Sequence, residues 1–203
     1  MKIIKINSNK ISPDQADFIV DYLKSGRTMA YPTDTVYGLG CDARNAKAIE
    51  KINKIKERTD PKPFLVLISD LKMLEKYCFA NFEQIEYLKT VWPASSAGGP
   101  GPVTAILKRR RNLPSELSGG LDSIAVRLPK NDFLVKIIRK AGFPIVSTSL
   151  NIKGGKPLAD VENLEKYFKF KPDLAVDAGK CGKIKPSRLV DIRDMENIKV
   201  LRK

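Results

Sequence analysis

Apolar runs of strand length alternate with amphipathic segments of helical period along this chain, and this alternation constrains the fold most. The spacing predicts a helix over about Ser12–Lys24 and strands at Thr28–Tyr31, Phe64–Ile68 and Ile124–Leu128. Strands separated by helices favour an α/β protein with a mixed, largely buried sheet. No linker-like stretch divides the 203 residues, so we expect one domain over residues 1–203.

The overall composition is that of a soluble globular protein, with 42% hydrophobic and 30% charged residues. No apolar run approaches the roughly 20 residues that a membrane helix needs, and the first residues lack the apolar core of a secretory signal. We therefore expect a cytoplasmic protein with no membrane partner. Lys and Arg outnumber Asp and Glu by 37 to 23, a formal charge of +14, which favours polyanionic partners such as nucleotides, RNA or acidic surfaces.

The chain contains no histidine, which excludes mechanisms that depend on a Ser-His-Asp triad, a Cys-His pair or an HExxH zinc motif. Cys41, Cys78 and Cys181 are isolated, so neither a structural metal nor a disulfide framework is expected. Neither GxGxxG nor GxxxxGK[ST] occurs at a strand end. Any catalysis must use Lys, Arg, carboxylates, hydroxyls, backbone dipoles or a borrowed metal ion.

Two apolar strands end in small polar residues and glycines. The first is in Thr28–Asp42, TMAYPTDTVYGLGCD, and the second runs into Ser147–Asn151, STSLN, followed by Gly154-Gly155. Open α/β sheets bind ligands beyond strand ends, so both segments are expected to line one concave site. The alternative is that both are polar turns whose hydroxyls bond to their own backbone.

Three basic features each permit two interpretations. The cluster from Lys56 to Pro63 follows a helix and either complements the helix dipole or binds an anion. The run Arg109–Arg111 is either a solvated hairpin end or an RNA contact. Arg127 lies inside the apolar segment IAVRLP, where a charge needs either a structural ion pair or a bound phosphate.

The motifs YPTDTVYGLGCDA, KER with KPF, GPVT, AVRLP, PIVSTSLN and PSRLVD occur in this order, and the set closely resembles the YrdC-like threonylcarbamoyl-adenylate synthases. The resemblance extends from about Ser12 to the C-terminus. It implies a twisted open mixed sheet with flanking helices, a large concave basic groove and no additional C-terminal domain. Two departures are an insertion at Ala94–Pro100 and Arg188, where the family more often has a small residue.

The resemblance implies a nucleotidyltransferase that joins L-threonine, bicarbonate or CO2 and ATP into threonylcarbamoyl-AMP and pyrophosphate, with Mg2+ accompanying ATP. The product would pass to a transferase that makes threonylcarbamoyladenosine in tRNA. Two alternatives stay open at this point. One is an RNA-binding protein of the same fold, for double-stranded RNA or tRNA, and the other is a paralogue that makes another carbamoyl-adenylate. Weak RNA binding by the synthase itself is also compatible with the charge.

The matching motifs assign roles to individual residues. Lys56 and Arg58 are expected to be catalytic, and Thr33, Tyr37 and Arg127 to bind threonine. No residue is expected to bind a metal. The expected nucleotide-binding residues are Lys56, Arg58, Lys62, Thr104, Ser147, Ser149, Asn151, Ser187 and Arg193.

Overall fold

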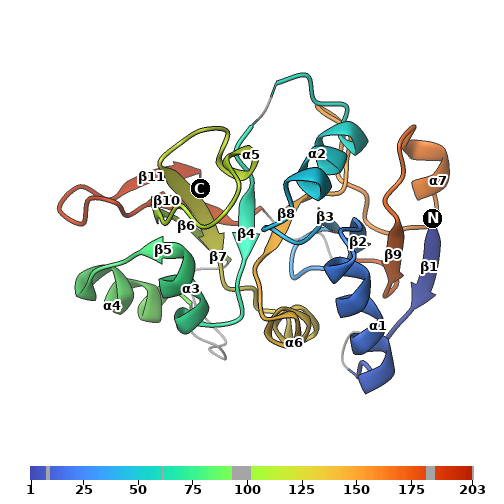
Figure 1. Ribbon diagram of the computed structural model, residues 1–203, viewed down its shortest axis with the longest axis horizontal. Coiled ribbons are helices and arrows are strands. Elements are labelled where there is room, and N and C mark those ends of the chain that lie inside the picture. Colours follow the sequence, from blue (N-terminus) through green and yellow to red (C-terminus); the bar gives the residue numbers. More distant parts are fainter. Residues whose placement is uncertain (8–9, 61, 93–101, 182–185, 203) are drawn as a thin grey trace.

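A mixed β-sheet runs through the molecule, with helices on both of its faces (Figure 1). The computed structural model describes residues 1–7, 10–60, 62–92, 102–181 and 186–202, so the expected insertion at 94–100 lies outside the described residues. The strands are β1 (Lys2–Lys5), β2 (Met29–Tyr31), β3 (Gly38–Gly40), β4 (Leu65–Leu67), β5 (Cys78–Phe79), β6 (Val103–Arg109), β7 (Ser123–Arg127), β8 (Ile145–Ser149), β9 (Leu174–Asp177), β10 (Arg188–Asp191) and β11 (Lys199–Arg202).

The strand order is β1-β9-β2-β3-β8-β4-β7-β6-β10-β11, and β5 pairs with β6. The pairs β1/β9, β2/β9, β4/β7 and β6/β10 are parallel, whereas β2/β3, β3/β8, β4/β8, β6/β7, β5/β6 and β10/β11 are antiparallel. The predicted α/β fold with an open mixed sheet is therefore confirmed. Strand β8 pairs on one side with β3 and on the other with β4, and so joins the two halves of the sheet.

Alternate side chains of the central strands enter two separate hydrophobic cores. Met29 and Tyr31 of β2 pack on one face with α1 (Pro13–Lys24) and α6 (Asp132–Ala141), whereas Ala30 packs on the opposite face with α2 (Ala46–Ile55). This two-residue period is the one expected of strands that are covered on both faces. The helices are α1 (Pro13–Lys24), α2 (Ala46–Ile55), α3 (Leu71–Tyr77), α4 (Phe82–Val91), α5 (Ser115–Ser118), α6 (Asp132–Ala141) and α7 (Leu164–Tyr167).

The helix boundaries follow from capping chemistry that is visible in the sequence. Ser12 accepts a hydrogen bond from the backbone of Gln15, whose side chain accepts one from the backbone of Ser12, a capping box at the start of α1. Asn45 caps α2 through the backbone nitrogen of Ala48 at 3.0 Å. Gly142 ends α6 in the left-handed conformation, with φ of 77°.

Several short elements differ from the sequence prediction. The patterns do not predict β3, β5, β11 or α5. The hydroxyl run Ser147–Ser149 lies inside β8 rather than after it, because β3 pairs with β8 as far as Ser149. The helical spacing of Phe82, Ile85, Leu88 and Val91 predicts that all four face inward. Phe82 is instead 79% exposed, since α4 buries Gln84 and Leu88.

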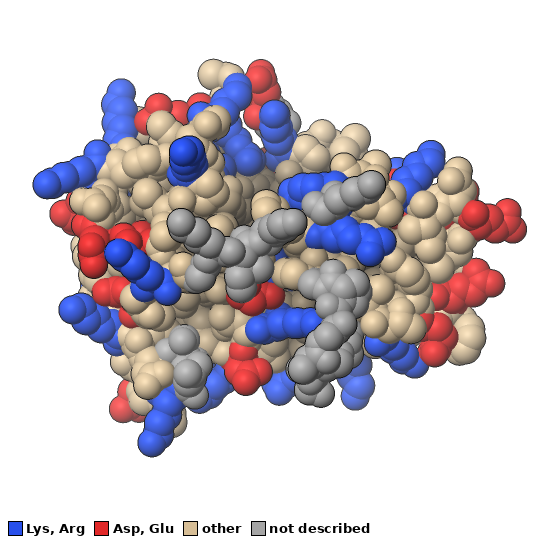
Figure 2. Space-filling view, turned by 180° about the vertical axis from the view of Figure 1, so that it is seen from behind, with Lys and Arg blue, Asp and Glu red and all other residues tan. Residues whose placement is uncertain are grey.

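Figure 2 views the molecule from behind and shows a surface that is hollowed near its middle, with Lys and Arg side chains on either side of the hollow. This distribution is compatible with the expected basic groove, which stays a prediction. None of the described helices is long and apolar enough to cross a bilayer.

Candidate active site

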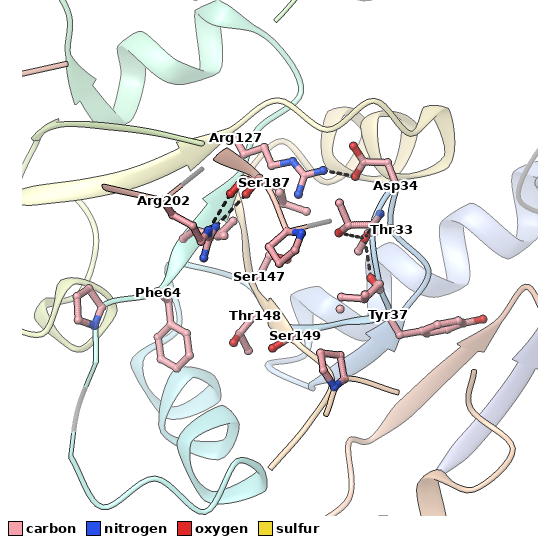
Figure 3. Close-up of a pocket in the computed structure, with 18 of the residues that line it drawn as sticks. Thr33, Asp34, Tyr37, Phe64, Arg127, Ser147, Thr148, Ser149, Ser187 and Arg202 are labelled. Atoms are coloured by element: carbon pink, nitrogen blue, oxygen red, sulfur yellow. Dashed lines mark hydrogen bonds and ion pairs between the residues drawn. The ribbon is translucent and has the colours of Figure 1, made fainter. Parts of the chain in front are cut away.

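A cavity of about 380 Å3 lies beside β8 (Figure 3). Its walls come from the loop between β2 and β3, the start of β4, the end of β7, β8 itself, the residues before β10, and β11. Residues 33–38 and 147–149 both line it. The structure therefore brings the two polar segments of the sequence into one cavity, although they are more than a hundred positions apart.

The hydroxyl of Thr33 is occupied by its own loop. Its Oγ1 donates to the carbonyl oxygen of Val36 at 2.6 Å and accepts from the backbone nitrogen of Thr35 at 3.0 Å. This is the polar-turn arrangement that the sequence left open as an alternative. Thr33 lines the cavity, but contact between its hydroxyl and a substrate threonine stays a prediction and would require one of these bonds to exchange.

Tyr37 forms part of the wall and directs its hydroxyl away from the cavity (Figure 3). The hydroxyl donates to the carbonyl oxygen of Gly179 at 2.8 Å and accepts from the backbone nitrogen of Ala178 at 3.0 Å. Burial raises the pKa of Tyr37 to about 12. The residue therefore braces the β2–β3 loop against the segment that follows β9, and its predicted contact with threonine is limited to the ring.

Arg127 and Asp34 form an ion pair at the edge of the cavity (Figure 3). The side chains are 7% and 12% exposed, respectively, and the second carboxylate oxygen of Asp34 accepts from the backbone nitrogen of Lys130 at 3.2 Å. The ion-pair interpretation of Arg127 is confirmed. Its Nε is nevertheless buried and makes no hydrogen bond to a described residue, so the guanidinium retains a donor for a ligand.

Lys56 lies directly after α2 and is 2% exposed. Its Nζ donates to the carbonyl oxygens of Ser149 and Asn151 at 2.6 and 2.7 Å, and to Oδ1 of Asn151 at 3.0 Å. The three donors of an ammonium group are thus matched by three oxygens. Neither Lys56 nor Asn151 lines the cavity. In this structure the pair holds the end of β8, and direct contact with a nucleotide stays a prediction for both.

The burial of Lys56 predicts a pH-dependent stability. Desolvation and then the charge of Arg58 lower the pKa of Lys56 to about 7, whereas an unfolded lysine titrates near 10.4. Between these values the unfolded chain binds more protons, so the free energy of unfolding rises with pH, by up to about 1.4 kcal/mol per pH unit. Urea unfolding from about pH 7 to 10 should show that the difference in free energy of unfolding between wild type and Lys56→Met rises with pH, because the other titrating groups are common to both proteins. A difference between them that is constant with pH would contradict the prediction.

Arg58 places a second guanidinium at the cavity. It stacks over the ring of Phe64 at 4.8 Å, and its Nη1 is buried without a hydrogen bond to any described residue. Burial lowers the pKa of Arg58. A buried donor without a partner is unfavourable unless a ligand or water completes it. Arg58 and Arg127 are therefore both cavity-lining residues whose guanidinium groups keep an unpaired donor.

Ser187 lines the cavity next to a residue that the sequence did not single out, Arg202. The guanidinium of Arg202 donates to the carbonyl oxygen of Ser187 at 2.8 Å and to its Oγ at 3.2 Å. Thr104 is fully buried behind it, with its hydroxyl 2.8 Å from that of Ser187. Thr104 thus supports Ser187 and does not line the cavity.

The structure does not bring Lys62 and Arg193 to the cavity. Lys62 is exposed, and Arg193 pairs with Asp191, with Nη2 and Oδ2 2.7 Å apart. Their nucleotide contacts stay predictions without support from this arrangement.

The run Arg109–Arg111 is mainly structural. Arg109 is buried and donates to the hydroxyl of Ser118 and to the carbonyl oxygen of Leu113. Arg110 donates from Nε to the carbonyl oxygen of Glu75 at 2.9 Å. Both interpretations of this run, a solvated hairpin end and an RNA contact, are therefore wrong for Arg109, because a buried guanidinium is accessible to neither water nor RNA.

The described residues contain no group of three or more His, Cys, Asp or Glu side chains that could hold a metal ion. Asp34 is the one carboxylate among the described residues that line the cavity, and Arg127 already pairs with it. The cavity is thus suited to anions and polar groups rather than to a resident cation.

The Sua5/YciO/YrdC family model, whose description is "Telomere recombination", matches residues 21–203. The chain belongs to this family. The match includes the segments that line the cavity, from the β2–β3 loop to β11, and it confirms the resemblance seen in the motifs.

Relatives within the family align with most of the chain. Threonylcarbamoyl-AMP synthase of Yersinia pestis is 33% identical over 177 residues, covering 85% of this chain and 88% of that protein. YciO of E. coli superposes with a TM-score of 0.85 at 27% identity, over 100% of this chain and 96% of YciO. Sua5 of Pyrococcus abyssi in complex with L-threonine superposes with a TM-score of 0.83 at 27% identity, over 94% of this chain. The chain spans 54% of that Sua5 chain.

Sequence reasoning missed several residues that line the cavity in this Sua5/YciO/YrdC protein. Arg202 was missed because β11 was not predicted: its sequence Lys-Val-Leu-Arg shows no two-residue alternation. Asp34 lies within the motif YPTDTVYGLGCDA, but the motif assigned it no role. Among the apolar wall residues, Phe64 and Pro186 lie within the motifs KPF and PSRLVD without an assigned role, and Pro157 lies in no motif.

Proposed function

We propose that this chain is an L-threonylcarbamoyladenylate synthase, which forms threonylcarbamoyl-AMP and pyrophosphate from L-threonine, bicarbonate or CO2, and ATP. The observation that carries the proposal is the cavity beside β8, where Arg58 and Arg127 each retain a buried, unpaired donor. The name of the Yersinia pestis relative and the L-threonine complex of Pyrococcus abyssi Sua5 support it.

The reaction can proceed here without a histidine. The threonine amine adds to CO2 and loses a proton to solvent to give a carbamate; when bicarbonate is the source, one water is released as well. An oxygen of the carbamate then attacks the α-phosphorus of ATP, the bond from that phosphorus to the oxygen bridging to the β-phosphate breaks, and pyrophosphate leaves. The protein then has to align the reactants and neutralise charge, and alignment alone can lower a barrier by roughly 7 to 11 kcal/mol. We assign the carboxylate of threonine to Arg127 and the phosphates to Arg58. Hydroxyl contacts to the nucleotide come from Ser147, Ser149 and Ser187, which line the cavity.

Mg2+ enters this scheme as part of the Mg–ATP substrate. The described residues offer no carboxylate cluster to hold it, so its ligands would be mainly phosphate oxygens and water. The activity is that of a nucleotidyltransferase. We further propose that it acts in the cytoplasm and that its product passes to a tRNA threonylcarbamoyl transferase.

Pyrophosphate release by the purified chain tests the proposal. We expect release from Mg–ATP only when both L-threonine and bicarbonate are present, with threonylcarbamoyl-AMP detected by mass spectrometry. Release that is independent of threonine would contradict the proposal. Equal turnover with ammonia or other amines in place of threonine would instead favour a paralogue that makes another carbamoyl-adenylate.

A further inference from the structure

A second cavity, of about 370 Å3, lies between α2 and the segment that follows α7. It shares no lining residue with the cavity beside β8. Figure 1 places α2 and α7 at the same end of the molecule, above β2 and β9 in that view. We call this cavity the basic hollow, and its charged and aromatic lining residues are Lys51, Lys54, Lys169, Phe170, Lys171 and Asp173.

The basic hollow carries an excess of positive charge that nothing in the described residues neutralises. Its four lysines take part in no ion pair there. Its one carboxylate, Asp173, accepts from the backbone nitrogen and the hydroxyl of Thr28 at 2.8 and 2.9 Å. Those bonds hold Asp173 at the base of the hollow. Lys51 donates to the carbonyl oxygen of Gly26 at 3.4 Å, so the ammonium groups that remain to bind an anion are those of Lys54, Lys169 and Lys171.

The hollow also presents an aromatic ring next to its cations. Phe170 is 49% exposed and stands between Lys169 and Lys171, with the ammonium of Lys169 5.6 Å from the ring centre. Phe79, which is also exposed beside basic residues, differs because the guanidinium of Arg110 already lies 4.3 Å from its ring centre. An exposed ring beside unpaired lysines is the combination that binds single-stranded nucleic acid, through stacking on bases and contacts to phosphates.

We propose that the basic hollow binds single-stranded RNA, with Lys54, Lys169 and Lys171 on phosphates and Phe170 stacked on a base. An acidic peptide would satisfy the lysines but would make no use of an exposed ring, and a duplex would keep its bases inside its own stack. The site is separate from the proposed catalytic cavity. RNA binding at this site would also give a role to part of the excess positive charge of the chain, which is +14. Arg109 and Arg110 do not provide such a role, because they bond to groups within the protein.

Fluorescence anisotropy with a short labelled oligoadenylate tests the inference on the full chain. The test variant is Lys54→Glu/Lys169→Glu/Lys171→Glu. The control carries the same charge change on the other basic region, Lys72→Glu/Lys108→Glu/Arg111→Glu, whose residues are all exposed. Between about 50 and 200 mM KCl, the logarithm of the binding constant for a single strand falls linearly with the logarithm of the salt concentration, with a slope of about 0.7 for each phosphate contact. We therefore expect the test variant to bind at least tenfold more weakly, with a salt slope lower by about 2.

Phe170→Ala should weaken binding several-fold to tenfold and leave the salt slope unchanged, because stacking releases no counterions. A Lys→Gln triple variant at the same positions should show an intermediate loss, and unchanged melting temperatures and pyrophosphate release would confirm folded enzyme. The inference is overturned if wild type does not bind the RNA at about 50 mM salt, if the control loses as much affinity as the test variant, or if polyglutamate displaces the RNA in wild type and in Phe170→Ala equally well.

Discussion

Gly40→Ala is expected to lower the free energy of unfolding by about 3 kcal/mol or more, at the upper end of the range for overpacked cores. A Cβ at this position would lie 1.9 Å from the carbonyl oxygen of Val146 and 3.0 Å from the ring of Tyr31. The carbonyl oxygen belongs to β8, and the ring is fully buried, so neither can move without shifting β3 against β8. Urea unfolding at neutral pH measures the loss.

Gly155→Ala is the matched control. Its Cβ would also meet an atom closely, at 2.4 Å, but that atom is the hydroxyl of Tyr167, the far end of a side chain that can turn aside. We expect a loss below about 1 kcal/mol. Equal losses in the two variants would show that the close approach of β3 to β8 is not what makes Gly40 necessary.

Arg58→Ala is expected to lower kcat/KM for ATP by about 100- to 1000-fold, the effect of removing a donor that stabilises developing charge. The reason is that Arg58 contributes an unpaired, buried donor to the cavity, and alanine leaves the phosphates without it. Arg58→Lys should recover only part of the activity, because a lysine lacks the planar fork of donors. Initial rates of pyrophosphate release with ATP varied at saturating threonine give the comparison.

Arg27→Ala provides the control for loss of an arginine that stacks on a ring. Arg27 lies over Tyr22 at 4.4 Å, as Arg58 lies over Phe64, but it does not line the cavity. Its removal should change kcat/KM less than twofold. If Arg58→Ala is as active as Arg27→Ala while both stay folded, the phosphate role of Arg58 is wrong.

The fold could be predicted where local chemistry determines it. Ser12 and Asn45 fix the starts of α1 and α2 through bonds to residues three positions away. Strand β3 could not be predicted, because its sequence Gly-Leu-Gly has low strand propensity. Strand β3 pairs with β8, and the backbone of β8 lies so close to Gly40 that only a residue without a Cβ fits there. This requirement comes from a partner strand more than a hundred residues away, so the local sequence does not reveal it.

The candidate site was predictable in outline and not in detail. Hydroxyls and glycines after apolar strands indicated which segments meet, and the motifs indicated Arg58 and Arg127. The sequence could not show which polar atoms the protein uses for itself. The ammonium of Lys56 bonds to residues 93 and 95 positions away, and the hydroxyl of Tyr37 bonds to Gly179. Such pairings depend on the completed fold, so residue type alone predicts contact with a ligand too often.

The position of β8 determines how the two halves of the sheet are connected beside the cavity. One half of the sheet contains β1, β9, β2 and β3, and the other contains β4, β7, β6, β5, β10 and β11. Within the described strands, the two halves are hydrogen-bonded to each other only through β8. The Asp34–Arg127 ion pair spans this seam, since Asp34 belongs to the first half and Arg127 to the second. The cavity is therefore bounded by both halves of the sheet, which β8 joins through backbone hydrogen bonds and the Asp34–Arg127 ion pair joins through side chains. A ligand that competes for Arg127 would weaken this side-chain connection.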